Sequence, residues 1–312
     1  MNIQQFQYVL AVVDFKNFEL AAEHCFVTQS TLSTMIGRLE DEMGIKIFNR
    51  KTKPVSLTKE GEELIIQFRV ILKEIDSLKN VVQELKGEVA GELRMGIIPT
   101  IAPFLLPLFL KSFAEAFPKV EFIVREMTTA DIQKALRNRV LDIGILAIPL
   151  EDPDLTELPL YDEPFLIYDC REEPFDGPIS IEELDYSKLF LLQEGHCLRT
   201  QVLQICELSN QYTTGKQNFE FESGSMDSLL RFTKANEGMT IVPFLASLDL
   251  PAKDKKCLVD FKLPTPVRSI GLITHKHFVK KRLLQELQKA IQQAVEKNQL
   301  SLSAEHHLFK PL

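Results

Sequence analysis

The sequence lacks several features that mark common classes of protein. Its formal net charge is -8, so no overall basic field favours nucleic acid, and any DNA contact must come from a local patch. Five cysteines in 312 residues do not make a disulfide scaffold, and no CxxC or Cys/His spacing suggests structural zinc. No apolar run reaches the roughly 18 residues of a membrane span, and the first residues do not resemble a signal peptide. We therefore expect a cytoplasmic protein without metal, cofactor or membrane partner, in which any disulfide is transient.

Residues 1–60 show the pattern of a helix-turn-helix. A short helix at Phe18–Cys25 precedes a turn and a second helix, for which Thr28 is a suitable N-cap and Gly44 a suitable C-terminal glycine. One face of the second helix carries an apolar stripe formed by Leu32, Ile36, Leu39 and Met43. Two short strands are expected at Ile45–Phe48 and Val55–Leu57, and the stretch 46–59 holds five basic side chains and no acidic one. That stretch predicts a wing that contacts phosphate.

The other face of the second helix is small and polar, as a major groove requires. Gln pairs with adenine, Ser and Thr with bases or phosphates, and Arg with guanine or phosphate. The side chains that we expect to contact DNA, on this face and in the wing, are Gln29, Ser30, Thr31, Ser33, Thr34, Arg38, Arg50, Lys51 and Lys53. For any one of them, an ordinary solvated position is the alternative interpretation.

Residues 61–90 predict one long helix with a narrow apolar seam. Apolar side chains recur at alternating spacings of four and three over three heptads, as in a coiled coil. The seam consists of Leu64, Phe68, Ile71, Ile75, Leu78, Val82 and Leu85. We interpret it as a dimer contact, because two DNA-binding domains in a dimer bind two half-sites on DNA. The alternative is a helix that packs against its own domain.

Residues 91–312 alternate strands with helices, which predicts a parallel α/β sheet. We place a first lobe at about 91–163 plus 268–300 and a second lobe at about 164–267, with crossing connections. The whole chain is then a multi-domain protein with an all-α winged helix-turn-helix, a linker helix and a two-lobed α/β regulatory domain. Ligands tend to bind between such lobes, at the carboxyl ends of strands.

Two cysteines in the second lobe predict a redox switch. Cys197 and Cys206 lie nine positions apart, with His196 and Arg199 close to the first. On one straight helix, nine steps separate the Cα atoms by about 13–14 Å and place them on opposite faces, whereas a disulfide needs about 7 Å or less. The pair can therefore bond only if this segment abandons any helix. The alternative is that each cysteine is a small core residue.

Other candidate residues lie near strand ends. Thr100 follows a strand at a helix start, Thr129 follows the next strand, and Arg268 opens a later one. Capping is the alternative for each threonine, and a surface ion pair is the alternative for the arginine. An arginine, His196 or a helix N-terminus would each lower the pKa of a nearby cysteine, and the sequence does not rank them.

The remaining cysteines carry no such pattern. For Cys25 and Cys257 we expect inert packing or exposure. Cys170 has the acidic neighbours Asp169 and Glu172, which would raise its pKa rather than lower it.

The N-terminal motifs resemble those of LysR-type transcriptional regulators. The matching segments are Ala21–Ala22, Val27–Ser30, Ser33, Ile36, Leu39–Glu40, Gly44–Ile45, Phe48–Arg50 and Leu57–Gly61. The resemblance implies a winged helix-turn-helix at 1–60, a linker helix at 61–90 and a periplasmic-binding-protein-like regulatory domain at 91–312. It also implies a dimer or homotetramer that binds promoter DNA and RNA polymerase and activates transcription, and it implies no enzyme.

A second resemblance is narrower. Gly96–Pro107, Asp162–Pro164 and Gly195–Arg199 with Cys206 are similar to the peroxide-sensing members of the LysR type. This implies that hydrogen peroxide oxidises Cys197 and that Cys206 resolves the product as a disulfide.

The same resemblance assigns further roles. Thr100, Thr129, His196 and Arg268 would hold peroxide or activate the thiol, and Thr200 stands where an acidic residue is frequent. Two other functions stay open: a LysR-type regulator that senses a small metabolite in the cleft, and a thiol peroxidase or disulfide reductase.

Overall fold

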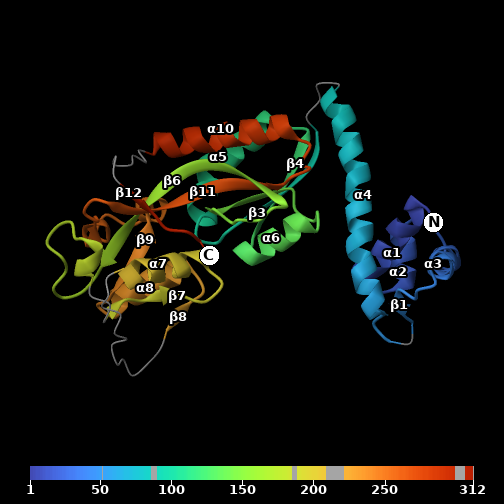
Figure 1. Cartoon of the computed structure of the whole chain (residues 1–312), viewed down its shortest axis with the longest axis horizontal. Coiled ribbons are helices and arrows are strands. Elements are labelled where there is room, and N and C mark those ends of the chain that lie inside the picture. The colour runs from blue at the N-terminus through green and yellow to red at the C-terminus, as the bar shows by residue number, and fades with distance from the viewer. Residues whose placement is uncertain (51, 86–89, 185–187, 209–220, 299–305, 312) are drawn as a thin grey trace. The chain divides into compact units, whose positions relative to one another are not determined.

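The computed structural model describes residues 1–50, 52–85, 90–184, 188–208, 221–298 and 306–311 (Figure 1). The chain divides into two compact units, which we describe separately. Unit 1 contains Met1–Glu88 with Asn138–Val140, and unit 2 contains Val89–Arg137 with Leu141–Leu312. Within the described residues, no helix is both long and apolar enough to cross a membrane.

Unit 1 is a helix-turn-helix with a short two-stranded wing. Its elements are α1 (Ile3–Phe15), α2 (Phe18–His24), α3 (Gln29–Met43), β1 (Phe48–Asn49), β2 (Ser56–Leu57) and α4 (Lys59–Leu85). Helix α3 starts at Thr28, whose Oγ1 accepts a hydrogen bond from the Thr31 amide at 3.2 Å, and ends at Gly44 with φ +67°. Both ends lie where the sequence predicts them.

The wing strands are shorter than the sequence predicts. The antiparallel pair joins only Phe48 to Leu57 and Asn49 to Ser56. The first predicted strand fails at its start because the Ile47 amide donates to the Glu40 carboxylate instead of to a neighbouring strand. The start of the wing is therefore a loop that is hydrogen-bonded to α3, and only two residues of each wing strand pair with one another.

The seam residues of the long helix α4 differ in burial along its length. Phe68 is buried in unit 1 and stacks on Phe6 with ring centroids 4.4 Å apart, so this part of the seam belongs to the unit's own core. Ile71, Leu78 and Val82 are exposed instead. Of the remaining seam residues, Leu64 and Ile75 are half-buried, and the side chain of Leu85 lies outside the description.

Unit 2 is built on a mixed sheet. Its main strands are β3 (Gly91–Ile97), β4 (Val120–Glu126), β5 (Ile143–Ile148), β6 (Leu155–Asp169), β9 (Met239–Pro243), β10 (Leu258–Val259) and β11 (Thr265–His275). β3 pairs in parallel with β4 and β5, but β11 lies between β5 and β6 and is antiparallel to both. The prediction of a parallel sheet is therefore wrong for β11 and β6, because β11 returns from the second lobe in the opposite direction.

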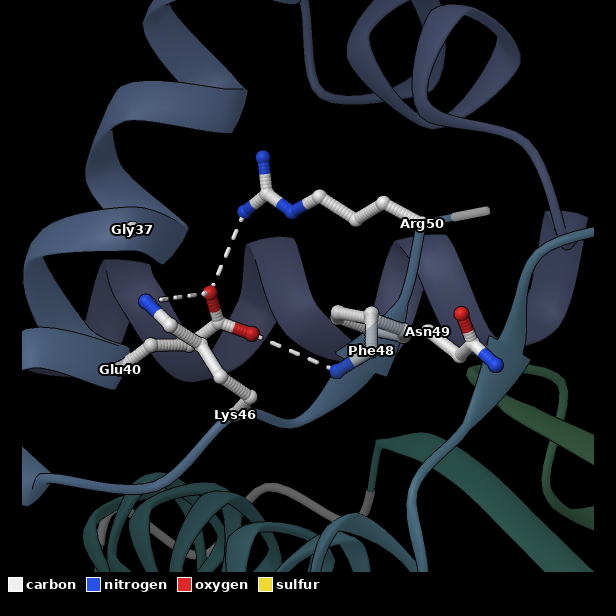
Figure 2. Close-up of a pocket in the computed structure, with 6 residues that line it drawn as sticks. All are labelled: Gly37, Glu40, Lys46, Phe48, Asn49 and Arg50. Carbon is white, nitrogen blue, oxygen red and sulfur yellow. Dashed lines mark hydrogen bonds and ion pairs between the residues drawn. The ribbon is translucent and has the colours of Figure 1, made fainter. Parts of the chain in front are cut away.

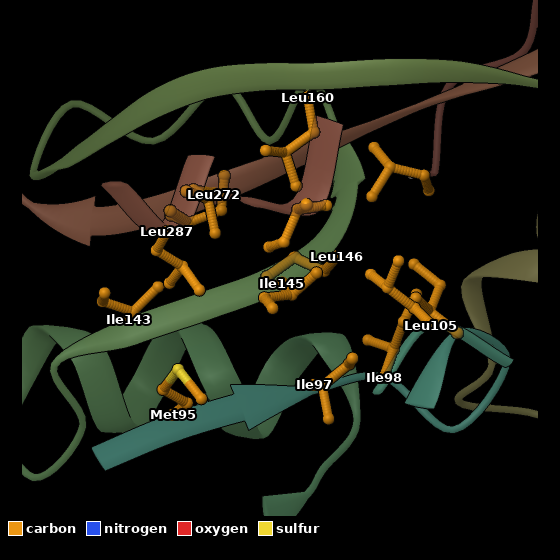
Figure 3. Packing of buried hydrophobic residues seen from close by; sticks show 14 of the residues in the cluster. Met95, Ile97, Ile98, Leu105, Ile143, Ile145, Leu146, Leu160, Leu272 and Leu287 are labelled. Atoms are coloured by element: carbon orange, nitrogen blue, oxygen red, sulfur yellow. The ribbon is translucent and has the colours of Figure 1, made fainter. Parts of the chain in front are cut away.

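Strand β6 connects two hydrophobic clusters. Its first part pairs with β11 up to Pro164, and its last part, from Phe165 to Asp169, pairs with β9. The first cluster surrounds β3, β5 and β11 and includes Met95, Ile145, Leu272 and Leu287, which Figure 3 shows packed together. The second cluster surrounds the last part of β6 and includes Phe165, Ile167, Leu198 and Ile241. We use the names first and second cluster for these sets below.

Short helices and strands complete unit 2. The α-helices are α5 (Ala102–Ala116), α6 (Thr129–Arg137), α7 (Cys197–Leu208), α8 (Met226–Ala235), α9 (Phe244–Leu248) and α10 (Lys281–Lys297). The remaining elements are the 3-10 helices η1 (Ile181–Glu183) and η3 (Lys255–Cys257) and the strands β7 (Leu191–Leu192), β8 (Glu222–Ser223) and β12 (His306–Leu308). The sequence also favours a strand near Asn218–Phe221, but residues 218–220 lie outside the described residues, and β8 begins directly after Phe221.

A buried carboxylate fixes the wing of unit 1 to α3. Glu40 Oε1 accepts from the amides of Ile47 and Phe48 at 2.8 and 3.3 Å. Glu40 Oε2 meets the guanidinium of Arg50 at 3.3 Å and Lys46 Nζ at 3.7 Å (Figure 2). The side chain of Glu40 is only 1% exposed. One α3 side chain therefore satisfies two backbone donors that would otherwise be buried without acceptors.

Replacement of Glu40 by alanine should loosen this part of unit 1. We expect Glu40→Ala to lower the free energy of unfolding by about 2–4 kcal/mol, because two amides lose their acceptor and a buried ion-pair partner is removed. Glu42→Ala on the same helix removes an exposed carboxylate and should change it by about 0.5 kcal/mol or less. Hydrogen exchange of peptides from residues 1–60 in the full chain, followed in urea, measures both. Equal effects of the two variants would contradict this account.

Candidate functional site

Cys197 begins helix α7 at the boundary between the two clusters. The preceding turn contains Gly195 with φ +90°, a conformation that favours glycine. Cys197 is a free thiol, 5% exposed, and packs in the first cluster. The next residue, Leu198, packs in the second cluster. The start of α7 therefore spans both parts of the core of unit 2.

A buried arginine lies at the centre of the site. Arg268 on β11 stands opposite Glu163 on β6 in the ladder, and the two side chains are 1% and 0% exposed. Arg268 Nε and Nη2 donate to Glu163 Oε2 at 2.9 and 2.8 Å. Its Nη1 also donates to Thr100 Oγ1 at 3.2 Å, and its Nη2 to the Thr100 carbonyl at 3.3 Å. The alternative of a surface ion pair is therefore wrong for Arg268.

Glu163 continues this network into the second lobe. Its Oε1 accepts from the amide of Leu245 at the start of α9, at 2.8 Å. Burial raises the pKa of Tyr161, two residues earlier on β6, and the nearby charge of Glu163 raises it further. Glu163 is not predictable as a functional residue from its sequence neighbours, because a buried carboxylate becomes apparent only when β6 and β11 are aligned.

Thr129 and His196 complete the surroundings of the thiol. Thr129 begins α6 and is 5% exposed, and its Oγ1 has no hydrogen-bond acceptor or donor at ordinary geometry among the described residues. His196 is 9% exposed. Burial lowers the pKa of His196, although a hydrogen bond with the backbone of Gly224 opposes this. His196 is therefore neutral near pH 7 and adds no positive charge to the site.

Opposing effects act on the pKa of Cys197. Burial raises it above the ordinary value and is the largest effect. The positive charge of Arg268, the Thr129 hydroxyl and the amides at the start of α7 all lower it. Arg199 faces elsewhere, because its Nη1 donates to the Leu192 carbonyl at 2.7 Å and its Nη2 pairs with Glu222 at 3.2 Å. Of the cationic candidates, Arg268 is therefore the one that acts on the thiol.

Cys206 lies on the same helix as Cys197. Both residues fall within α7, which is continuous from Cys197 to Leu208. At about 1.5 Å per residue, nine residues of helix separate the two Cα atoms by about 13–14 Å. The side chain of Cys206 lies outside the description. The helical form of this segment and a bond between the two sulfurs therefore exclude one another.

The residues expected to contact DNA all belong to unit 1 but differ in their exposure and in their contacts with other side chains. On α3, the side chains of Gln29, Ser30, Thr31, Thr34 and Arg38 are exposed, and in the wing Lys53 is exposed as well. Lys51 lies outside the described residues. Arg50 donates to Ser33 Oγ at 2.8 Å, pairs with Glu40 and lies over the Phe18 ring at 5.0 Å. Arg50 therefore holds the wing beside α3 in addition to any contact with phosphate.

Two protein families match this chain. Residues 3–62 match the bacterial regulatory helix-turn-helix protein, lysR family. Residues 86–296 match the LysR substrate binding domain. The first match covers unit 1 from α1 to the start of α4, and the second covers unit 2 from β3 to nearly the end of α10, including the site around Cys197.

Individual relatives agree with these matches. The chain is 31% identical over 276 residues to the DNA-binding transcriptional dual regulator OxyR of Escherichia coli, which covers 88% of this chain and 89% of that protein. It is 31% identical over 277 residues to the HTH-type transcriptional regulator EstR of Acinetobacter baylyi, covering 88% and 91%. A full-length OxyR variant from Pseudomonas aeruginosa is similar in structure, with a TM-score of 0.76 at 30% identity over 94% of this chain and 98% of that one.

The reactivity of Cys197 should depend steeply on pH. Because only the thiolate is alkylated and the pKa of Cys197 is raised, the rate of alkylation by iodoacetamide should increase up to about tenfold per pH unit from pH 7 to 9. Thr129→Val removes a group that lowers this pKa and should move the curve to higher pH. Arg199→Met should leave the curve unchanged. Mass spectrometry of the Cys197 peptide measures the rate, and a flat profile would contradict the balance described above.

The same threonine allows a test of stability. Thr129→Val replaces a buried hydroxyl, whose one described interaction is with the Cys197 thiol, with a methyl group of similar size, so the free energy of unfolding should stay within about 1 kcal/mol or increase. Thermal and urea unfolding of the full chain measure this change. A loss of more than about 2 kcal/mol would mean that the hydroxyl has a stabilising partner after all.

Proposed function

The chain belongs to the LysR family of bacterial transcriptional regulators, and on this basis we propose that it senses hydrogen peroxide through Cys197 and Cys206. The family matches cover both units, and the chain is 30–32% identical to several proteins called hydrogen peroxide-inducible genes activators. The observation that carries the proposal is the free, buried Cys197 at a helix start, with the charge of Arg268 acting on it.

The chemistry takes place in two steps. The thiolate of Cys197 attacks one peroxide oxygen, the O–O bond breaks, and the leaving hydroxide takes a proton to become water. The product is a sulfenic acid. Cys206 then attacks that sulfur, a second water leaves, and a disulfide forms. Overall, two thiols are oxidised while one peroxide is reduced to two waters.

The neighbouring side chains have distinct roles in the first step. Arg268 stabilises the negative charge of the thiolate and of the departing oxygen, and Glu163 holds it in place. The Thr129 hydroxyl, which acts on the Cys197 thiol, would donate to a peroxide oxygen, and Thr100, held by Arg268, would border the same region. His196 is neutral and is therefore a hydrogen-bonding group rather than a source of charge.

The second step converts oxidation into a change of shape. In its helical form, α7 places Leu198, Val202 and Ile205 in the second cluster. Gln201 Nε2 also donates to the buried carbonyl of Phe309, at 3.0 Å. Unwinding of α7 would withdraw these contacts together. We infer that the second lobe then repacks and changes how the regulatory domains of the copies associate. This would change the distance between their winged helix-turn-helix domains on DNA.

Assembly and partners follow from the family. We infer a dimer formed through the seam of α4, with Ile71, Leu78 and Val82 as the exposed apolar part available to a second copy. Pairing of such dimers gives a homotetramer on promoter DNA, where it meets RNA polymerase, so the protein acts in the cytoplasm. As a regulator, it consumes peroxide only to switch state and is not an enzyme.

The switch itself can be tested directly. One equivalent of hydrogen peroxide should join Cys197 to Cys206 and change the DNase footprint on promoter DNA. Cys206→Ser should stop at the sulfenic acid, and Cys197→Ser should not react at this site. Mass spectrometry of alkylated peptides identifies each product. A changed footprint with the two cysteines unlinked would refute the disulfide mechanism.

The same variants separate the remaining alternatives. A regulator that senses a metabolite in the cleft should keep its response when Cys197 is replaced by serine, whereas a peroxide sensor should lose it. A thiol peroxidase should turn over peroxide repeatedly with a thiol reductant in the absence of DNA. For this chain we expect the response to be lost in Cys197→Ser and turnover to stay low.

A further inference from the structure

Two further cysteines lie beside each other in the second lobe, away from α7. Cys170 follows the last residue of β6, and Cys257 is the last residue of η3, directly before β10. The β10–β6 ladder pairs Leu258 with Tyr168 and Val259 with Ile167, and η3 lies against β6. The chain therefore brings two thiols together that are 87 positions apart in sequence (257 − 170).

The side chains of this pair interact directly. The Cys170 thiol lies close enough to the Tyr168 hydroxyl and to the Cys257 thiol for both groups to affect its pKa. Burial, as the largest cause, and the neighbouring Cys257 raise the pKa of Cys170 to about 12. Both cysteines are half-buried at the margin of the second cluster. They are therefore in contact and are still partly open to solvent.

The backbone geometry suits a disulfide. Paired residues in an antiparallel ladder have Cα atoms about 4.5–5.5 Å apart, and the register of β10 and β6, continued by one residue, sets Cys257 opposite Asp169, the neighbour of Cys170. A disulfide tolerates Cα atoms up to about 7 Å apart. In contrast to Cys197 and Cys206, these two cysteines do not share one helix, so a bond between them would not require a helix to unwind. A bond here needs only a local adjustment.

The surroundings of Cys257 are rich in positive charge. Lys253, Lys255 and Lys256 are all exposed within four residues before it. Asp254 in the same stretch is paired with Lys234. The exposed acidic side chains of Glu172 and Glu173 follow Cys170 rather than Cys257 in the sequence. An anionic molecule would therefore approach Cys257 from the lysine side.

We propose that Cys170 and Cys257 form a second redox pair, oxidised by exchange with an anionic low-molecular-weight disulfide. The Cys257 thiolate attacks one sulfur of that molecule, its S–S bond breaks, and the released thiolate takes up a proton. The Cys170 thiolate then attacks Cys257 in the mixed disulfide and releases the second small thiol. Two protein thiols are oxidised, and one small disulfide is reduced to two thiols.

The environment of Cys170 fixes the order of these steps. A thiol with a pKa of about 12 is almost wholly protonated at neutral pH, so Cys170 is a poor first nucleophile. When Cys257 enters the mixed disulfide, the thiol that helps to raise the pKa of Cys170 is gone. The second attack is also intramolecular, which compensates for a small thiolate fraction.

The test uses the full chain carrying Cys197→Ser and Cys206→Ser, so that the peroxide-sensing pair cannot contribute. After incubation with oxidised glutathione, free thiols are blocked with N-ethylmaleimide and peptides are analysed by mass spectrometry. We expect a cross-linked peptide that joins Cys170 to Cys257, with Cys25 alkylated. Alkylation of both Cys170 and Cys257, or glutathione retained on Cys257, would overturn the proposal.

Two variants in the same background sharpen the result. Cys170→Ser should stop at the mixed disulfide on Cys257, which assigns the attacking thiol, whereas a Cys257 that is alkylated and carries no glutathione would overturn that assignment. Lys255→Glu with Lys256→Glu should slow the reaction severalfold with oxidised glutathione but not with the cationic disulfide cystamine. An equal effect on both reagents would remove the role of the lysines.

The outcome is independent of the peroxide switch. In the otherwise unmodified chain, Cys170→Ser should leave the peroxide-driven bond between Cys197 and Cys206 unchanged. Failure of one pair to react therefore says nothing about the other.

Discussion

The buried ion pair of Arg268 and Glu163 is the interaction on which the regulatory unit depends. Two charges taken out of water are expensive, and they are tolerated only when further hydrogen bonds satisfy their remaining atoms. Here those bonds come from Thr100 after β3 and from the Leu245 amide on α9. The pair therefore joins both lobes at the point where β6 and β11 cross between them, and it places a fixed positive charge beside the Cys197 thiol.

The same arrangement exposes the Cys197 thiol to opposing influences on its pKa. Burial favours the neutral thiol, whereas Arg268 and the amides of α7 favour the thiolate. These influences act on one atom, so a small shift in packing at the start of α7 changes its ionisation. Glu40 in the DNA-reading unit follows a comparable principle, because a single buried carboxylate there ties together backbone amides and two basic side chains.

The sequence predicts those features that are decided locally. Thr28 and Gly44 mark the ends of α3 because a cap depends only on the few residues around it. The direction of β11 was not predictable, since it depends on a chain that leaves the first lobe and returns about a hundred residues later. Strand β6 was missed because Pro159 and Pro164 argue against a strand, yet Pro159 lies at an irregularity in the ladder with β11. Glu163 becomes visible as a partner of Arg268 only once that ladder is aligned.

Because the helical form of α7 and a bond between Cys197 and Cys206 exclude one another, the packing of α7 would contribute to the midpoint potential of the proposed switch. Every contact that stabilises the helix favours the reduced state and makes the disulfide a stronger oxidant. For a two-electron couple, about 1.4 kcal/mol of helix stabilisation corresponds to about 30 mV. The apolar residues of α7 and the hydrogen bond from Gln201 to Phe309 would therefore affect the reduction potential of the proposed disulfide without contacting either sulfur atom.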